Sequence, residues 1–237
     1  MLVAIHQPNY LPWCGYFAKL AAADCFVVLD DVALPRGRSY VSRTQILGAG
    51  QAQWLSIPLQ RTLSPSIGHV QFADSRWPAR HARTLHERYG RTPFGSAVLP
   101  QLLAVYDDPG EYLATFNLRL LRAVVALLGL ETRLVLASEL GRPGSGSQHL
   151  ADLVAALGGT AYLSGPSGKK YLDESLFTRM GIPIYYGAYM TRPYSQRQPP
   201  FVPGLSIVDA LCHIGPEGTR RLLDYPGSPG HSQQPEA

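Results

Sequence analysis

A dense cluster of polar and aromatic side chains lies near the amino end of the chain, in the segment HQPNYLPWCGY from His6 to Tyr16. It directly follows a short apolar run, Leu2 to Ile5, which is typical of a buried strand. Ligands of α/β proteins bind at the carboxyl ends of the strands, so this segment is expected to face a crevice. The alternative is a structural loop whose polar groups bond to the nearby backbone. We take His6, Asn9 and Tyr10 as candidate catalytic residues and Gln7 as a candidate substrate-binding residue.

Two carboxylates, Asp30 and Asp31, directly follow the next apolar run, Cys25 to Leu29. If this run is the neighbouring strand, both carboxylates lie at the same sheet edge as His6. A carboxylate beside an imidazole fixes its tautomer and raises its basicity. Asp30 and Asp31 are therefore candidate catalytic residues, with the alternative that one of them caps the following turn.

A glycine-containing segment, SGPSGKKY from Ser164 to Tyr171, follows a predicted strand and precedes a predicted helix. Backbone N–H groups and a lysine in that position can hold a phosphate or a carboxylate. The GxxxxGK[ST] spacing is absent, and a tight turn explains the glycines almost as well. Lysine is rare in this arginine-rich chain, which favours Lys169 for anion binding or proton transfer. The candidate substrate-binding residues of this segment are Ser164, Gly165, Ser167, Gly168 and Lys169.

Arg43 is a further candidate for binding an acidic group. It lies with Arg36 and Arg38 just past Asp31, around Ser39-Tyr40, and a guanidinium binds a carboxylate or phosphate through two hydrogen bonds. A solvated basic loop is an equally good interpretation of Arg36 and Arg38.

Metal and hydrolase motifs are missing. His81 and His86 are five positions apart, which excludes an HExxH site, and no other His, Cys or Asp group has ligand spacing. No GxSxG segment is present. We therefore expect no metal and no cofactor.

The apolar pattern predicts the scaffold for these residues. The chain has 237 residues, 46% hydrophobic and 16% charged, which is enough to bury a large core. The runs 2–5 and 25–29, with a predicted helix over 15–23 between them, form the unit from which parallel sheets are built. Further strands are predicted at 53–59, 67–72, 133–137, 160–163 and 182–186, and helices at 78–89, 112–128, 148–157, 172–180 and from Ser206, a possible N-cap. We expect a Rossmann-like α/β fold, a mostly parallel sheet with helices on both faces, as one domain over 1–225 followed by a disordered tail, 226–237.

Charge, cysteine content and hydropathy limit the partners. A net charge of +4, scattered along the chain, does not predict nucleic-acid binding but suits an acidic substrate. Three cysteines without CxxC spacing indicate reduced thiols. No apolar stretch approaches the roughly 18 residues of a membrane span, and the amino end does not resemble a signal peptide. We expect a cytoplasmic protein without a membrane partner. A homodimer is compatible with the sequence.

Several long segments, in order and spacing, resemble the WbqC-like protein family: HQPNYLPWCGYFAKLAAADCFVVLDDV, RSYVSRTQI, TAYLSGPSGKKYLDESLFTRMGIPIYY and FVPGLSIVDALCHIGP. The resemblance covers about residues 2–216. Members are associated with O-antigen, other polysaccharide and natural-product gene sets, which implies a biosynthetic role. Cys14 departs from the family pattern, where an aliphatic residue is usual, and this weighs against a required nucleophile. The family's motif positions are occupied here by His6, Gln7, Asn9, Tyr10, Asp30, Asp31, Arg43, Ser164, Gly165, Gly168, Lys169 and Asp209.

The leading expectation is a metal-independent biosynthetic enzyme that forms a C–N bond, by acyl or aminoacyl transfer to an amine or by cyclisation of an amino-thioester. His6 would remove the amine proton, Asp30 or Asp31 would orient His6, and Asn9 would hold the oxyanion. Lys169 and Arg43 would hold the acidic part of a small-molecule or carrier-protein-bound substrate.

Two alternatives stay open. The strand, the segment Pro12 to Tyr16 and the following helix and strand look like the HxGH region of nucleotidylyltransferases, with Trp13 and Tyr16 at the two histidine positions. That layout favours a nucleotidyl-transferring or adenylate-forming enzyme. The absence of a complete catalytic signature is compatible with a non-catalytic binding protein of a biosynthetic complex.

Overall fold

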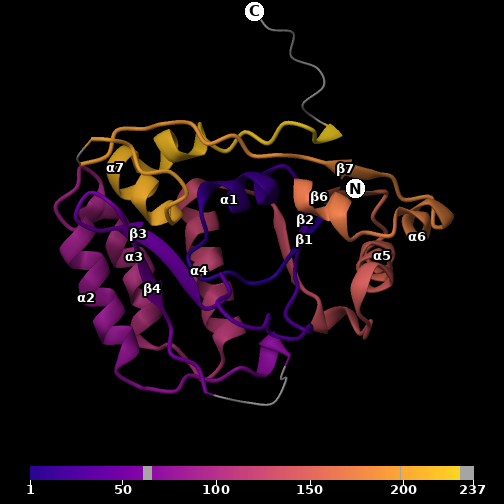
Figure 1. The fold of residues 1–237 in the computed structure, drawn as a ribbon, viewed down its shortest axis with the longest axis horizontal. Coiled ribbons are helices and arrows are strands. Elements are labelled where there is room, and N and C mark those ends of the chain that lie inside the picture. The colour runs from indigo at the N-terminus through magenta and orange to yellow at the C-terminus, as the bar shows by residue number, and fades with distance from the viewer. Residues whose placement is uncertain (61–65, 198, 230–237) are drawn as a thin grey trace, which may run out of the picture.

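A five-stranded parallel sheet forms the centre of the fold in the computed structural model, which describes residues 1–60, 66–197 and 199–229 (Figure 1). The strand order is β5-β2-β1-β6-β7, and every neighbouring pair runs parallel. The strands are β1 (Leu2–His6), β2 (Cys25–Val28), β5 (Arg133–Leu136), β6 (Ala161–Ser164) and β7 (Ile184–Tyr186). The predicted α/β fold is thereby confirmed.

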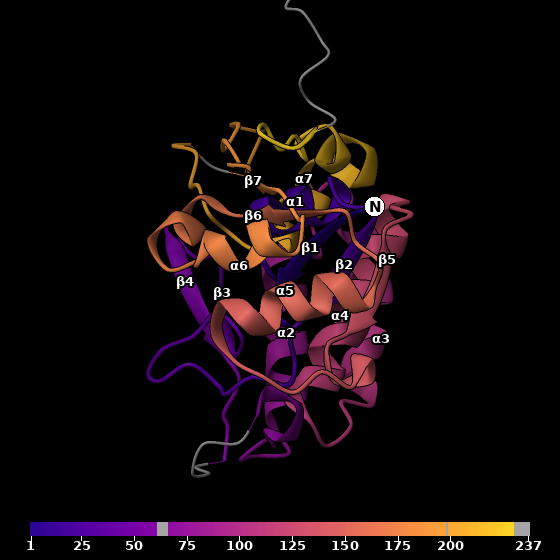
Figure 2. The ribbon, with the colours of Figure 1, turned by 90° about the vertical axis from the view of Figure 1, so that its right-hand side faces the viewer.

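Helices cover both faces of this sheet because its strands are apolar on both sides. Val3 and Ile5 of β1 pack toward α5 (Gly146–Ala156) and α6 (Glu174–Arg179). Ala4, between them, packs with α1 (Cys14–Ala21) and α4 (Leu113–Leu128) on the other face. Figure 2 looks onto the first face, with α5 and α6 in front of the strands. This alternation is the period of two that a strand imposes on its side chains.

A helical region stands beside the sheet, on the left in Figure 1. It consists of α2 (Trp77–Tyr89), α3 (Gly95–Asp107), α4 and α7 (Ile207–Arg220), packed with an antiparallel hairpin of β3 (Arg43–Leu47) and β4 (Ala52–Ser56). Short 3₁₀ turns lie at η1 (Ile67–His69), η2 (Ser138–Leu140) and η3 (Pro166–Lys170). Each helix in the described ranges is too short or too polar to cross a membrane.

Several predicted elements differ from the structure. The strand predicted at 67–72 is wrong: Ile67, which is fully buried, begins the 3₁₀ turn η1, and Gln71 and Phe72 form only isolated bridges, to Tyr112 and Leu59. Helix α3 was not predicted, since Pro100 lies inside it. The N-cap predicted for the last long helix is confirmed, because the Ser206 hydroxyl accepts a hydrogen bond from the Val208 N–H.

The predicted tail begins with residues that pack on the sheet region. The carbonyl of Pro226 accepts a hydrogen bond of 3.0 Å from the Ala188 N–H, and Ser228 is buried. The prediction of a disordered tail therefore does not hold for residues 226–229, and the rest of that segment, 230–237, lies outside the described residues.

Asn117 of α4 joins the loop that follows β1 to the segment that precedes β3. It is fully buried, and its Nδ2 donates hydrogen bonds of 2.8 Å to the carbonyls of Pro8 and Val41. A single amide thus fixes the path of the loop that leaves the carboxyl end of β1.

Replacing this amide by an apolar side chain should destabilise the protein. In Asn117→Leu the carbonyls of Pro8 and Val41 lose their donors, which should lower the free energy of unfolding by about 2–4 kcal/mol in urea denaturation. Gln101→Leu, at an exposed position of α3, is the matched control and should change it by less than about 0.5 kcal/mol. A loss below about 1 kcal/mol in Asn117→Leu would contradict the anchoring role.

Candidate active site

A cleft of about 950 Å³ opens at the carboxyl end of the sheet. The chain leaves β1 on one side for β2 and returns on the other side as β6, so the cleft lies at the topological switch point of the sheet. Its walls come from the ends of β1 and β2, from α1, from the start of α5 and from the segments after β6 and β7. This is the edge at which the sequence predicts a site.

Lys19 carries the only charged side chain among the described residues that line the cleft. Helix α1 is apolar from Cys14 to Leu20 apart from this lysine, and Lys19 is 6% exposed. Its Nζ donates a hydrogen bond of 2.8 Å to the carbonyl of Ile5, one residue before β1 ends. Burial lowers the pKa of Lys19 to about 7. The neutral amine is therefore far more accessible at neutral pH than it is for an ordinary lysine.

His6 lies next to this amine and is neutral. Its Nδ1 donates a hydrogen bond of 3.2 Å to the carbonyl of Gln7, and its ring meets the Tyr16 ring edge-on at 4.8 Å. Burial, and secondly the charge of Lys19, lowers the pKa of His6 to about 4. Because Nδ1 carries the proton, Nε2 is left as a hydrogen-bond acceptor.

The Asp31 carboxylate orients a second histidine of the cleft. His149, in the first turns of α5, places its Nε2 3.1 Å from Asp31 Oδ2, and its side chain is 1% exposed. Within the described ranges its Nδ1 has no hydrogen-bond partner. Helix α5 covers the opposite face of the sheet from α1, so His149 and Lys19 reach the cleft from two sides.

Asp30 has a structural role at the sheet edge. Its two carboxylate oxygens accept hydrogen bonds of 3.0 and 2.7 Å from the N–H and hydroxyl of Ser138. These bonds tie the end of β2 to the turn that follows β5. The alternative that an aspartate caps the following turn does not describe Asp30, because its carboxylate bonds to Ser138, which is 108 positions away.

Aromatic rings form much of the cleft wall. The Trp13 and Tyr189 rings meet edge-on at 5.2 Å, which brings the segment after β7 against the start of α1. Large aromatic surfaces of this kind favour the flat or apolar part of a ligand. The aromatic lining residues are Trp13, Tyr16, Tyr162, Tyr171, Tyr189 and Tyr225.

Four of the predicted site residues line the cleft: His6, Gln7, Gly165 and Ser167. Gly168 lies just behind this wall, where a Cβ would come within 2.1 Å of the Ser164 hydroxyl, so the glycine is needed for close approach. The Ser164 hydroxyl itself donates to the Gly165 carbonyl. This segment therefore lines the cleft with Gly165, Pro166, Ser167 and Tyr171.

Other predicted site residues lie elsewhere. Asn9 is buried off the cleft, and the Tyr10 hydroxyl is in the core, 2.9 Å from His81 Nδ1. The Arg43 guanidinium stacks over the Trp54 ring in the β3–β4 hairpin. Lys169 is exposed, with its Nζ 5.2 Å from the Tyr186 ring centre, and it does not line the cleft with His6.

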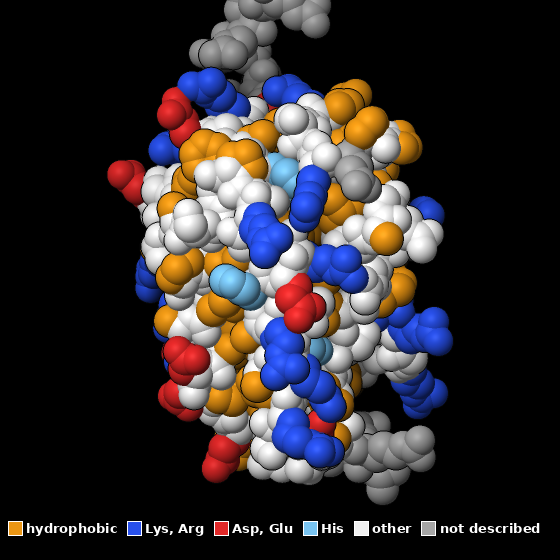
Figure 3. All heavy atoms as spheres, turned by 90° about the vertical axis from the view of Figure 1, so that its left-hand side faces the viewer, with side chains coloured by type: hydrophobic (Ala, Val, Ile, Leu, Met, Phe, Trp, Pro, Cys, Tyr) orange, Lys and Arg blue, Asp and Glu red, His pale blue; other side chains and the backbone are white. Residues whose placement is uncertain are grey.

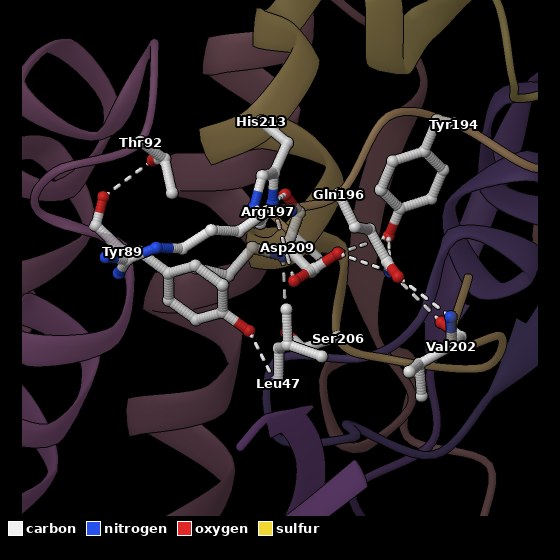
Figure 4. A network of polar contacts seen from close by, with 11 residues as sticks. Leu47, Tyr89, Thr92, Tyr194, Gln196, Arg197, Val202, Ser206, Asp209 and His213 are labelled. Atoms are coloured by element: carbon white, nitrogen blue, oxygen red, sulfur yellow. Dashed lines mark hydrogen bonds and ion pairs between the residues drawn. The ribbon is translucent and has the colours of Figure 1, made fainter. Parts of the chain in front are cut away.

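Asp209 serves a separate buried network, drawn in Figure 4. Its Oδ2 accepts hydrogen bonds of 2.7 Å from the Tyr194 hydroxyl and 2.8 Å from Gln196 Nε2. The network fastens the segment between β7 and α7 to α7, and that segment carries Tyr189 to the cleft.

Lys19 and His149 are the functional candidates that sequence reasoning missed. A lysine within the otherwise apolar helix CGYFAKLA was the available signal for Lys19, since a buried lysine is rare. No local signal marked His149, whose partner Asp31 is 118 positions away. In the part of the chain that the structure describes, no three His, Cys, Asp or Glu side chains gather in a way that could hold a metal.

Comparisons with known proteins agree with the resemblance seen in the motifs. The sequence model described as the WbqC-like protein family matches residues 7–221. The uncharacterized protein Rv1507c of Mycobacterium tuberculosis is 31% identical over 219 residues, which is 91% of this chain and 94% of that protein. No solved structure matches the chain significantly.

The three cysteines should be unreactive in the folded protein. Burial raises the pKa of Cys14 and of Cys212 to about 12, and it also raises the pKa of Cys25. At about pH 8, a thiol-specific disulfide reagent should label none of them quickly in the native protein and all three in denaturant. Rapid labelling of Cys14 in the native protein would contradict this and restore it as a candidate nucleophile.

Proposed function

The chain belongs to the WbqC-like protein family, and from that premise we propose that the cleft is the active site of a biosynthetic enzyme that forms a carbon–nitrogen bond. The reaction class is transfer of an activated acyl or aminoacyl group to an amine, or cyclisation of an amino-thioester. The observation that carries the proposal is Lys19, a buried amine with a pKa of about 7 beside a neutral imidazole in the cleft. A base of that strength suits proton transfer at neutral pH.

In this reaction the substrate amine attacks the carbonyl carbon, the C–N bond forms and the C–S or C–O bond to the carrier breaks. His6 accepts a hydrogen bond from the amine at Nε2 and orients its lone pair. Lys19 takes the proton that the nitrogen loses. His6 is thus a positioning and binding group rather than the base that the sequence suggested, because a pKa of about 4 makes it a weak base at neutral pH.

We assign to the Asp31–His149 pair the donation of a proton to the leaving group. His149 reaches the cleft from the face opposite Lys19, and the 3.1 Å contact with Asp31 fixes its ring orientation. In this assignment the leaving group receives its proton from the His149 side of the cleft, while Lys19 removes the proton of the attacking nitrogen from the other side.

The composition of the walls supports an acyl substrate over a nucleotide. A triphosphate is normally held by several cationic groups and backbone amides. Here Lys19 is the one charged group among the described lining residues, whereas six aromatic rings line the walls. We therefore rank the nucleotidyl-transferring alternative below acyl transfer and propose a substrate with an apolar or aromatic acyl part, carried by a small molecule or a carrier protein.

The test uses N-acetylcysteamine thioesters of apolar and aromatic amino acids, with an amine or an alcohol as acceptor. Wild type should form the amide, seen by mass spectrometry, with matching release of thiol. Lys19→Met should lower turnover roughly 10²–10⁴-fold, the scale for losing a general base. Lys170→Met, an exposed lysine off the cleft, is the matched control and should keep full activity.

Three outcomes would contradict the proposal. Ester formation without amide would assign a hydroxyl acceptor. ATP-dependent release of pyrophosphate without aminolysis would favour the nucleotidyl alternative. Tight binding of the thioesters without any turnover would favour a binding protein.

The rate should depend on pH through Lys19. Only the neutral amine accepts a proton, so kcat/KM should rise as the pH is raised through about 7. His6 is neutral at every pH above about 4 and should add no further step between pH 5 and pH 9. A kcat/KM profile that is flat across pH 7 in wild type would argue against Lys19 as the base.

A further inference from the structure

A second group of cationic side chains surrounds two adjoining cavities away from the cleft. The cavities have volumes of about 200 and 180 Å³, and both are lined by Arg197 and His213. Arg88 and the Gly48–Gly50 turn of the hairpin line the first, and Arg91 lines the second. Figure 3 shows Lys and Arg side chains gathered on the face of the molecule that α2 occupies. None of these residues lines the cleft.

The three guanidinium groups lack an acidic partner within the described ranges. Arg88, Arg91 and Arg197 are exposed, and none forms an ion pair, although Glu87 lies on the wall of the first cavity. Arg88 donates one long hydrogen bond, 3.4 Å, to Gln53 Oε1. Like charges that share a cavity repel one another, and a bound anion would remove that repulsion.

A buried histidine holds the backbone of Arg197 in place. Nε2 of His213 accepts a hydrogen bond of 3.1 Å from the Arg197 N–H, and its Nδ1 donates one of 2.8 Å to the Asp209 carbonyl. The His213 side chain is 5% exposed and stands between Asp209 and the cavities. Figure 4 shows Arg197 extending from this anchor toward Tyr89 of α2. The guanidinium is thus presented from a fixed backbone rather than from a loose loop.

We propose that the two cavities bind a small phosphorylated metabolite. A phosphate group is the anion that several guanidinium forks recognise best, because each fork can make two parallel hydrogen bonds and a dianion offsets more than one positive charge. The shared wall of Arg197 and His213 places the phosphate between the cavities, and the organic remainder occupies the larger one beside the Gly48–Gly50 turn. The site does not depend on the chemistry proposed for the cleft.

Isothermal titration with inorganic phosphate and with glycerol 3-phosphate, at constant ionic strength, tests this site. Both should bind saturably to wild type, and the ester should bind at least as tightly as the free ion. Arg197→Gln and Arg91→Gln should each weaken binding about tenfold or more, as expected for a lost charged hydrogen-bond pair. Arg83→Gln removes the same charge from an exposed site on α2 that lines neither cavity and should change Kd less than about twofold.

Several results would overturn the proposal. Equal weakening by Arg83→Gln and Arg197→Gln would show a general charge effect without a site. Binding of free phosphate but not of the ester would exclude a metabolite. Absence of saturable binding to wild type would remove the site altogether. Circular dichroism of each variant checks folding, and Lys19→Met should bind phosphate as wild type does, which separates this site from the cleft.

Discussion

The proposed chemistry depends on the burial of one amine, Lys19, against the backbone carbonyl of Ile5 near the end of β1. Lys19 lies on an otherwise apolar stretch of α1, and its Nζ is held by the Ile5 carbonyl without a carboxylate partner in the described chain. Burying an uncompensated charge is costly, so the amine favours its neutral form and its pKa falls to about 7. The same surroundings keep His6 neutral. Because β1 is the central strand, paired on both sides, Ile5 and the amine are fixed in place.

The rest of the scaffold brings two further groups, Asp31 and His149, to this end of the sheet. The Asp30–Ser138 hydrogen bonds join the ends of β2 and β5, and Asp31 next to them holds His149 from the opposite face of the sheet. Asp209, by contrast, fastens the segment after β7 to α7. The cleft wall is largely aromatic and carries one amine, whereas arginines that form no ion pair with any described residue lie around the cavities beside α2.

Sequence patterns predicted the sheet because its strands are short, mainly apolar and separated by clear turn residues. They predicted the edge that carries the cleft for the same reason, and His6, Gln7, Gly165 and Ser167 lie there. They did not predict where the side chains of Arg43 and Lys169 point, since side-chain direction depends on tertiary contacts. Arg43 stacks over Trp54, and Lys169 lies near Tyr186. Nor did they find the Asp31–His149 pair, which joins residues far apart in the chain. Helix α3 was not predicted because it contains Pro100, and proline usually ends a helix.

The most direct test is the ionisation of Lys19 itself. The chain has three lysines, Lys19, Lys169 and Lys170, so side-chain NMR of lysine labelled with ¹³C and ¹⁵N gives a simple spectrum, and the Lys19 resonance is the one lost in Lys19→Met. We predict that this resonance titrates near pH 7. If the Lys19 amine instead stays protonated to above about pH 9, as an unperturbed lysine does, the proposed role of Lys19 as the base is contradicted.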